Sequence, residues 1–141
     1  MTEKKDCGFL LKQINDRVEK NANNTLRAQD MTMSQLGALL ELSQAPEGRL
    51  SLKELEKALY VAQSTMAGII ARLERKGFVE PLEDAGDRRV KLVRITPSGL
   101  ELVRSAELHR AEMEERLFRA LTKEERSILY TLLKKVHDSL G

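Results

Sequence analysis

The sequence has few of the residues that cross-link or stiffen a chain: its 141 residues include one cysteine, three prolines and no tryptophan, and aromatic residues make up 4%. A single cysteine excludes an intrachain disulfide framework and suits a reducing compartment, where thiols stay free. The apolar content therefore comes mainly from Leu, Ile, Val and Ala, which favours helices over an all-β sandwich. We expect a mainly helical, intracellular protein.

Long apolar segments are also missing. No apolar run approaches the roughly 20 residues needed to span a bilayer, and residues 1–6 lack the apolar stretch of a signal peptide. These absences predict a cytoplasmic protein with no membrane partner. Charged residues make up 33% of the chain, but the net charge is only +2. That value does not indicate nucleic acid by itself, because an electrostatic footprint needs clustered charge.

Helical spacing of apolar residues dominates the rest of the sequence. It predicts six helices, over residues 6–26, 32–43, 51–59, 63–76, 96–121 and 122–140. Three of them begin with the spacing of a capping box, in which two side chains satisfy backbone N–H groups at the helix start: Thr32/Gln35, Ser51/Glu54 and Thr122/Glu125. The asparagines of the first helix predict an early end around Asn24, and Gly77 closes the fourth helix.

A β-hairpin is predicted between the fourth and fifth helices. Its strands are residues 78–82 and 90–95, and the polar, turn-forming residues 83–89 make a long charged tip. Pro81 lacks the N–H group that a central strand needs, so it marks its strand as an edge. Residues 46–48 are predicted to form only a turn.

The order of these elements predicts a single domain, residues 1–141, that is mainly α with a small β-hairpin. The two short helices before the hairpin, joined by a tight link, form a helix-turn-helix inside a compact lobe of residues 32–96. The outer helices, over 6–26 and 97–140, carry broader apolar stripes than so small a lobe can cover. Uncovered stripes of that size mark a partner surface, so we expect a homodimer joined through both chain ends.

The helix over 63–76 has two different faces. One side is a predicted core face formed by Met66, Ile69, Ile70 and Leu73. The opposite side has small residues where an exposed helix usually carries Glu, Lys or Gln, and one of them, Gly68, costs about 1 kcal/mol relative to Ala. A DNA major groove accepts a helix with such a face, and base edges and phosphates would meet its leading end, Gln63, Ser64 and Thr65. The alternative is that the small residues pack against another helix of the same chain.

The hairpin favours the DNA interpretation. Its tip brings together Arg88, Arg89 and Lys91, and a ribbon beside a recognition helix can place an arginine in the adjacent minor groove. Residues 51–91 carry eight positive and seven negative charges, so there is no bulk basic patch. Binding would depend on the placement of charges, with Asp87 orienting Arg89 rather than cancelling its charge.

Five motifs together resemble the multiple-antibiotic-resistance regulator (MarR) family of winged-helix transcription factors. They are QST at 63–65, RLERKGFV at 72–79, DRR at 87–89, ITPSG at 95–99 and LTKEE at 121–125. The resemblance covers about residues 8–140. It implies a dimer formed by the first, fifth and sixth helices, in which two winged-helix lobes bind a pseudo-palindromic operator in double-stranded DNA.

The resemblance also implies which residues contact DNA. By position, Arg89 matches the wing arginine that enters the minor groove in the family. Gly68 and Pro81 depart from the family pattern, since arginines are common at both positions, and this implies fewer charged contacts. With neighbouring cations included, the candidate DNA-binding residues are Gln63, Ser64, Thr65, Gly68, Arg72, Arg88, Arg89 and Lys91.

Control by a signal is a further implication of the resemblance. An anionic or phenolic small molecule is expected to bind where the end helices meet the winged lobe and to release the operator. One branch of the family senses organic hydroperoxides with a cysteine near the position of Cys7, whose neighbours Lys4 and Lys5 favour a thiolate. That branch also uses tyrosines near the cysteine. The tyrosines here, Tyr60 and Tyr130, lie outside the first helix, which favours a bystander thiol over a redox sensor.

The sequence offers no catalytic constellation. His109 and His137 stand on different helices without the spacing of metal ligands, and no phosphate-binding loop, metalloprotease helix or nucleophile elbow occurs. We therefore expect no enzyme activity, no metal and no cofactor.

Two interpretations of function remain. The first is a dimeric, sequence-specific DNA-binding repressor released by a small-molecule or oxidative signal. The second is a winged-helix module that binds a protein partner and has no operator. The small-residue face and the paired arginines at the hairpin tip favour the first, because they suit a groove better than a flat protein surface.

Overall fold

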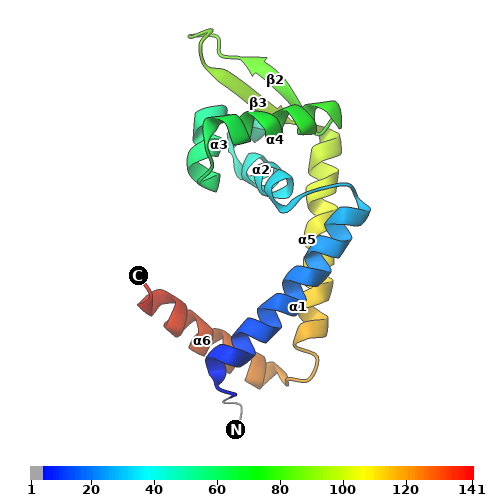
Figure 1. The fold of residues 1–141 in the computed structure, drawn as a ribbon, viewed down its shortest axis with the longest axis vertical. Helices are drawn as coiled ribbons and strands as arrows, with labels where there is room; N and C mark the ends of the chain where they lie inside the picture. Colours follow the sequence, from blue (N-terminus) through cyan, green and yellow to red (C-terminus); the bar gives the residue numbers. More distant parts are fainter. Residues whose placement is uncertain (1–4) are drawn as a thin grey trace. The chain divides into compact units, whose positions relative to one another are not determined.

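The structure, a computed structural model, describes residues 5–141 except the side chain of Asn23 (Figure 1). In chain order its elements are α1 (Cys7–Ala28), α2 (Met33–Gln44), the 3-10 helix η1 (Pro46–Gly48), β1 (Arg49–Ser51), α3 (Leu52–Leu59), α4 (Gln63–Arg75), β2 (Val79–Glu83), β3 (Lys91–Ile95), α5 (Pro97–Leu117) and α6 (Lys123–Ser139). The predicted fold class, mainly helical with a small β element, is confirmed.

The chain divides into two compact units, and the boundary lies inside α5, between Val103 and Arg104. The first unit contains the helix-turn-helix and the sheet. The second contains the rest of α5 and α6. None of the described helices is long and apolar enough to cross a membrane.

Local sequence signals start and stop several of the helices. All three predicted capping boxes form with both of their reciprocal hydrogen bonds, at Thr32/Gln35, Ser51/Glu54 and Thr122/Glu125. Gly77 follows α4 with φ +78°, the left-handed conformation that ends a helix at little cost only for glycine. These boundaries agree with the predictions because each depends on neighbours in the sequence.

The predicted hairpin is part of a three-stranded antiparallel sheet with the order β1-β3-β2. Leu50 of β1 and Pro81 of β2 pair with opposite sides of the same residue, Val93. The edge position predicted from Pro81 is confirmed, but the prediction of two strands alone is wrong. β1 has three residues, too few to show a periodic pattern, and it forms because β3 supplies its hydrogen-bonding partner.

The second strand of the hairpin begins one residue later than predicted. Val90 lies in the turn rather than in β3, and its N–H donates to the carbonyl oxygen of Asp87 at 3.2 Å. Val90 belongs to the turn because this hydrogen bond closes the loop before the strand starts.

The core of the first unit lies among α2, α3, α4 and the sheet. Its fully buried large side chains are Leu39, Leu42, Leu55, Met66, Leu73 and Val93. The predicted core face of α4 is confirmed, because all four of its residues are buried. Burial of that face determines which side of α4 points away from the lobe.

Thr96 and Gly99 attach the start of α5 to the end of α4. The Thr96 hydroxyl donates to the carbonyl oxygen of Gly77 at 2.7 Å and accepts the N–H of Gly99 at 3.1 Å. A Cβ atom at Gly99 would collide with the carbonyl oxygen of Phe78 and with Ile95. The ITPSG motif therefore lets the first turn of α5 approach the sheet closely.

The end of α1 differs from the prediction. The helix continues to Ala28 instead of ending around Asn24. Leu26, 7% exposed, is part of the hydrophobic core, and its carbonyl oxygen accepts the N–H of Met31 at 2.8 Å. Tertiary packing of Leu26 therefore outweighs the poor helix propensity of the asparagines.

The end of α5 also differs, because the helix stops at Leu117 and not near Leu121. Arg126 of α6 makes two hydrogen bonds with the carboxylate of Glu115, at 3.0 and 3.2 Å, and its Nε donates to the carbonyl oxygen of Phe118 at 3.0 Å. These bonds satisfy the end of α5 and start the turn into α6. Ala120 lies in this turn and is exposed.

Large apolar side chains are exposed on the outer helices. On α1 of the first unit they are Leu10, Leu11, Ile14 and Val18. On the second unit they are Leu108, Leu117, Ile128, Leu132, Leu133, Val136 and Leu140. The stripes that the sequence predicts thus exist and are left uncovered within the single chain.

Candidate nucleic-acid interface

The leading end of α4 is open. Gln63, Ser64 and Thr65 form its first turn and are exposed, and Ala62 stands at the N-cap, where no side chain of the described residues makes a capping hydrogen bond. The start of α4 therefore differs from the capped starts of α2, α3 and α6. Backbone N–H groups at such an end, together with the helix dipole, favour a phosphate.

The outer face of α4 has room for a close approach. Among the described residues, a Cβ atom at Gly68 would have no neighbour within 4 Å beyond its own helix backbone. Ala67 and Ala71 on the same side are exposed. The alternative that these small residues pack against another helix of the same chain is wrong for the described chain.

The wing is held by short turns that begin with aspartates. Asp84 accepts the N–H of Gly86 at 2.8 Å, and Asp87 accepts the N–H of Arg89 at 2.9 Å. Asp87 also accepts hydrogen bonds from the Arg89 guanidinium, at 3.2 and 3.4 Å. The backbone hydrogen bond from Arg89, and then the side-chain bonds, lower the pKa of Asp87 below its ordinary value. The expected orientation of Arg89 by Asp87 is present in this geometry.

The other predicted wing cations differ in their surroundings. Arg88 and Lys91 are exposed. Arg94 of β3, not among the predicted site residues, forms a cross-strand ion pair with Glu80 of β2. Figure 1 shows β2 and β3 extending beside α4 within the same unit, so the recognition helix and the wing belong to one body.

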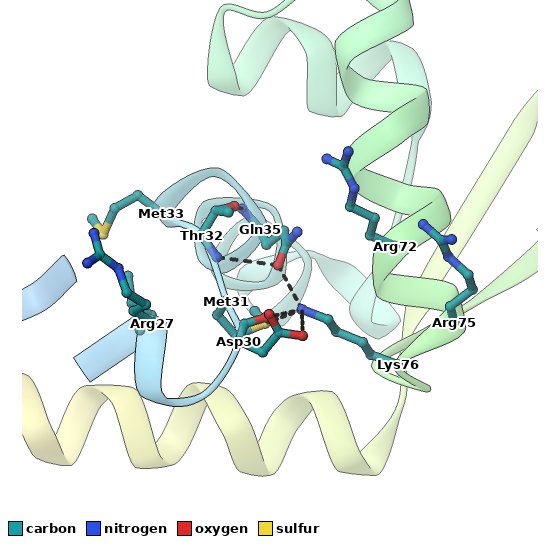
Figure 2. Close-up of a pocket in the computed structure, with 10 residues that line it drawn as sticks. Arg27, Asp30, Met31, Thr32, Met33, Gln35, Arg72, Arg75 and Lys76 are labelled. Carbon is teal, nitrogen blue, oxygen red and sulfur yellow. Dashed lines mark hydrogen bonds and ion pairs between the residues drawn. The ribbon is translucent and has the colours of Figure 1, made fainter. Parts of the chain in front are cut away.

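Arg72 lies in a different place from the other predicted residues. It lines a cavity of about 810 Å³ between α4 and the α1–α2 turn (Figure 2). The lining residues are Leu26, Arg27, Asp30, Met31, Thr32, Met33, Gln35, Arg72, Arg75 and Lys76. Four cations and one carboxylate make this a cationic cavity with an apolar wall.

The sequence does not predict this cavity. Arg72, Arg75 and Lys76 have the spacing of one helix face, which is a signal of a cationic stripe and not of a cavity. The opposite wall comes from α1 and the turn after it, where Met31 lies 45 residues before Lys76 in the chain. Nothing in the local pattern places those two segments together.

Cys7, the candidate redox sensor, and the tyrosine Tyr60 are both exposed. Cys7 begins α1, and Lys4, invoked as its neighbour, lies outside the described residues. Tyr60, at the end of α3, is 94% exposed and adopts a left-handed conformation with φ +55°. Among residues 5–141, no three His, Cys, Asp or Glu side chains are grouped to hold a metal ion.

Comparison with known proteins agrees with the fold. A sequence profile described as MarR family matches residues 29–90. The multiple antibiotic resistance protein MarR of Salmonella typhimurium is 30% identical over 130 residues, which cover 92% of this chain and 89% of that protein.

Solved structures extend the likeness to the whole chain. The crystal structure of MepR, a transcription regulator of the Staphylococcus aureus multidrug efflux pump MepA, has a TM-score of 0.86 at 28% identity and covers 97% of this chain and 100% of that one. A mutant of Escherichia coli MarR complexed with operator DNA has a TM-score of 0.69 at 30% identity and covers 92% of this chain and 91% of that one.

A helix-turn-helix followed by an antiparallel wing, with an open recognition helix, defines a winged-helix DNA-binding transcription regulator. Within that class, the chain belongs to the MarR family. Several of its relatives are named as transcription regulators or repressors, so the expectation that it is not an enzyme is confirmed.

Proposed function

We propose that this MarR-family regulator is a homodimeric repressor that binds a pseudo-palindromic operator with α4 in the major groove and Arg89 in the minor groove. The observation that carries the proposal is the open outer face of α4, where Gly68 leaves space for DNA to approach the helix backbone. Gln63, Ser64 and Thr65 supply polar groups at the leading end of the helix, and Arg88, Lys91 and Arg72 add positive charge.

The homodimer is supported by the uncovered apolar side chains of α1 and α6. Two-fold symmetry presents two identical recognition helices, so the preferred DNA has two inverted half-sites. A dimer bound over a promoter would exclude RNA polymerase from the same DNA, which makes repression the simplest outcome of binding. The proposed place of action is the cytoplasm.

The cationic cavity is the proposed site of an anionic effector. Its volume, about 810 Å³, lies within the range of about 300–1,000 Å³ typical of small-molecule sites. Leu26, Met31 and Met33 offer apolar contacts, while Arg72 and Arg75 offer hydrogen bonds to a carboxylate or phenolate. By linkage, such a ligand releases the operator only if it prefers the conformation that does not bind DNA.

The test is an electrophoretic mobility assay with the DNA upstream of the protein's own gene at two salt concentrations. Each phosphate contact should contribute a slope of about −0.9 in log K against log salt. Binding without salt dependence would remove the phosphate-contact mechanism. No binding to this DNA or to a selected random library would favour the protein-interaction module.

A further inference from the structure

Lys76 follows the last residue of α4 and reaches across the cavity to the turn between α1 and α2 (Figure 2). Its ammonium group donates to the carbonyl oxygen of Asp30 and, at 3.2 Å, to Oε1 of Gln35. It also contacts Sδ of Met31 at 3.7 Å, and the Asp30 carboxylate lies 3.9 Å away. An ammonium group has three N–H donors, so these contacts occupy all of them.

Gln35 connects this contact to the start of α2. The residue is only 3% exposed, and its Oε1 accepts the N–H of Thr32 at 3.3 Å as well as the hydrogen bond from Lys76. One amide oxygen thus receives a hydrogen bond from the first turn of α2 and another from the end of α4. A buried acceptor that loses a partner destabilises its surroundings, so the two helix ends depend on each other through Lys76.

The partners of Lys76 are weak competitors for an anion. Two of them are neutral oxygens and one is a thioether sulfur, and the single carboxylate, that of Asp30, is fully exposed. A charge-assisted hydrogen bond is roughly twice as strong as one to a neutral acceptor. A carboxylate held in the cavity by Arg72 and Arg75 would therefore draw N–H donors of Lys76 away from the turn.

We propose that Lys76 is a positioning residue that couples the cavity to the recognition helix. In the free protein, its hydrogen bonds tie the end of α4 to the α1–α2 turn, and an organic carboxylate with an apolar body breaks this tie by binding Nζ. The inference rests on the proposed function, because it names the side chain through which the effector would act on operator binding. A recognition helix that loses one of its attachments is no longer held in a single orientation for the groove.

The first experiment measures amide hydrogen exchange of the dimer without DNA. Lys76→Met removes the charge at similar length, Lys76→Arg keeps the cation, and Lys123→Met in α6 is the matched control. We expect the amides of Met31 and Thr32 to exchange at least about threefold faster in Lys76→Met, since local opening governs their exchange. Benzoate should cause the same change in the wild type, whereas neutral benzamide should not. Lys76→Arg and Lys123→Met should behave as the wild type does.

The second experiment measures operator affinity by fluorescence anisotropy with and without saturating benzoate. Benzoate should weaken binding of the wild type and of Lys76→Arg about tenfold, a typical coupling between sites. In Lys76→Met the change should be less than about twofold, because the tie is already absent. Lys76→Gln replaces the methionine variant if circular dichroism shows that the latter does not fold.

The outcomes separate this inference from the proposed function. Unchanged exchange in the neutral Lys76 variant, or in the wild type with benzoate, overturns the inference whatever the DNA result. A neutral variant that keeps the full wild-type response to benzoate also overturns it. A wild type that binds no operator DNA refutes the proposed function, while the exchange result still decides the role of Lys76.

Discussion

Asp87 binds both the backbone and the side chain of Arg89 with one carboxylate: Oδ1 accepts the N–H at 2.9 Å and Nε at 3.2 Å, and Oδ2 accepts Nη2 at 3.4 Å. The Arg89 side chain nevertheless remains 91% exposed. The carboxylate therefore orders the turn and the root of the guanidinium while leaving its outer edge free for a groove. This explains how a lobe with nearly balanced charge can still present an oriented cation.

Arg89→Ala should separate DNA binding from folding. The side chain packs against no core residue, so circular dichroism and the melting temperature should stay close to those of the wild type. Operator affinity should fall by about 1–3 kcal/mol, most strongly on sites with a narrow minor groove. Anisotropy on operators with and without A-tracts measures the difference. If folded Arg89→Ala binds every sequence as tightly as the wild type, the wing does not contact DNA.

The wing turn should persist at acidic pH. Hydrogen bonds from Arg89 hold the folded-state pKa of Asp87 below its ordinary value of 3.8. A lowered pKa means that the stabilisation is complete above the unfolded-state value and is lost as the pH falls through the folded-state pKa. The midpoint of the pH titration of the Arg89 Nε–H signal in NMR should therefore lie below 3.8. In Arg89→Ala the titration of Asp87 should move upward, and an unmoved titration would contradict the assigned cause.

Gly68→Ala should stabilise the protein and weaken DNA binding. No described atom beyond its own helix backbone lies within 4 Å of the new methyl group, so the variant should gain about 0.5–1 kcal/mol from helix propensity. The same methyl group should obstruct the approach of DNA and lower operator affinity. Gly77→Ala is the contrasting control, because its φ of +78° should cost about 1–2 kcal/mol. A stabilised Gly68→Ala with full affinity would show that DNA does not approach this face.

Thr65→Ala should identify the kind of contact made by the first turn of α4. If the hydroxyl binds a base edge, the variant should lose about 1–3 kcal/mol and relax preference at one position of each half-site. If it binds a phosphate, all sequences should weaken alike and the salt slope should fall by about 1. Anisotropy on single-base operator variants distinguishes the two, and equal affinity throughout excludes both.

Leu132→Glu should disrupt the predicted homodimer. Leu132 is 55% exposed on α6 within the single chain, and a charge on a buried dimer face would be strongly unfavourable. Sedimentation at micromolar concentration should show a dimer for the wild type and a shift toward monomer or unfolded chain for the variant. Ser127→Glu on the same helix is the control. A folded wild-type monomer would defeat the prediction.

Part of the candidate site could be predicted from the sequence, because its determinants are local. The core face of α4 follows from helical periodicity, and the turn that orients Arg89 follows from an aspartate two residues before it. The openness of the outer face at Gly68 is a tertiary fact, since the same small residues would suit a buried helix contact.

Residues a few positions apart specify where α2, α3 and α6 begin, through their capping boxes, and where α4 ends, through Gly77. They also specify which face of each helix is apolar, so these features could be predicted from the sequence. Three features depend on tertiary packing: the existence of β1, the extension of α1 by Leu26, and the contact of Lys76 with Gln35, 41 residues away in the chain. Such contacts cannot be recognised from periodicity or from neighbouring residues in the sequence. They form only when separate helices and strands pack together and each supplies hydrogen-bonding or apolar partners to the other.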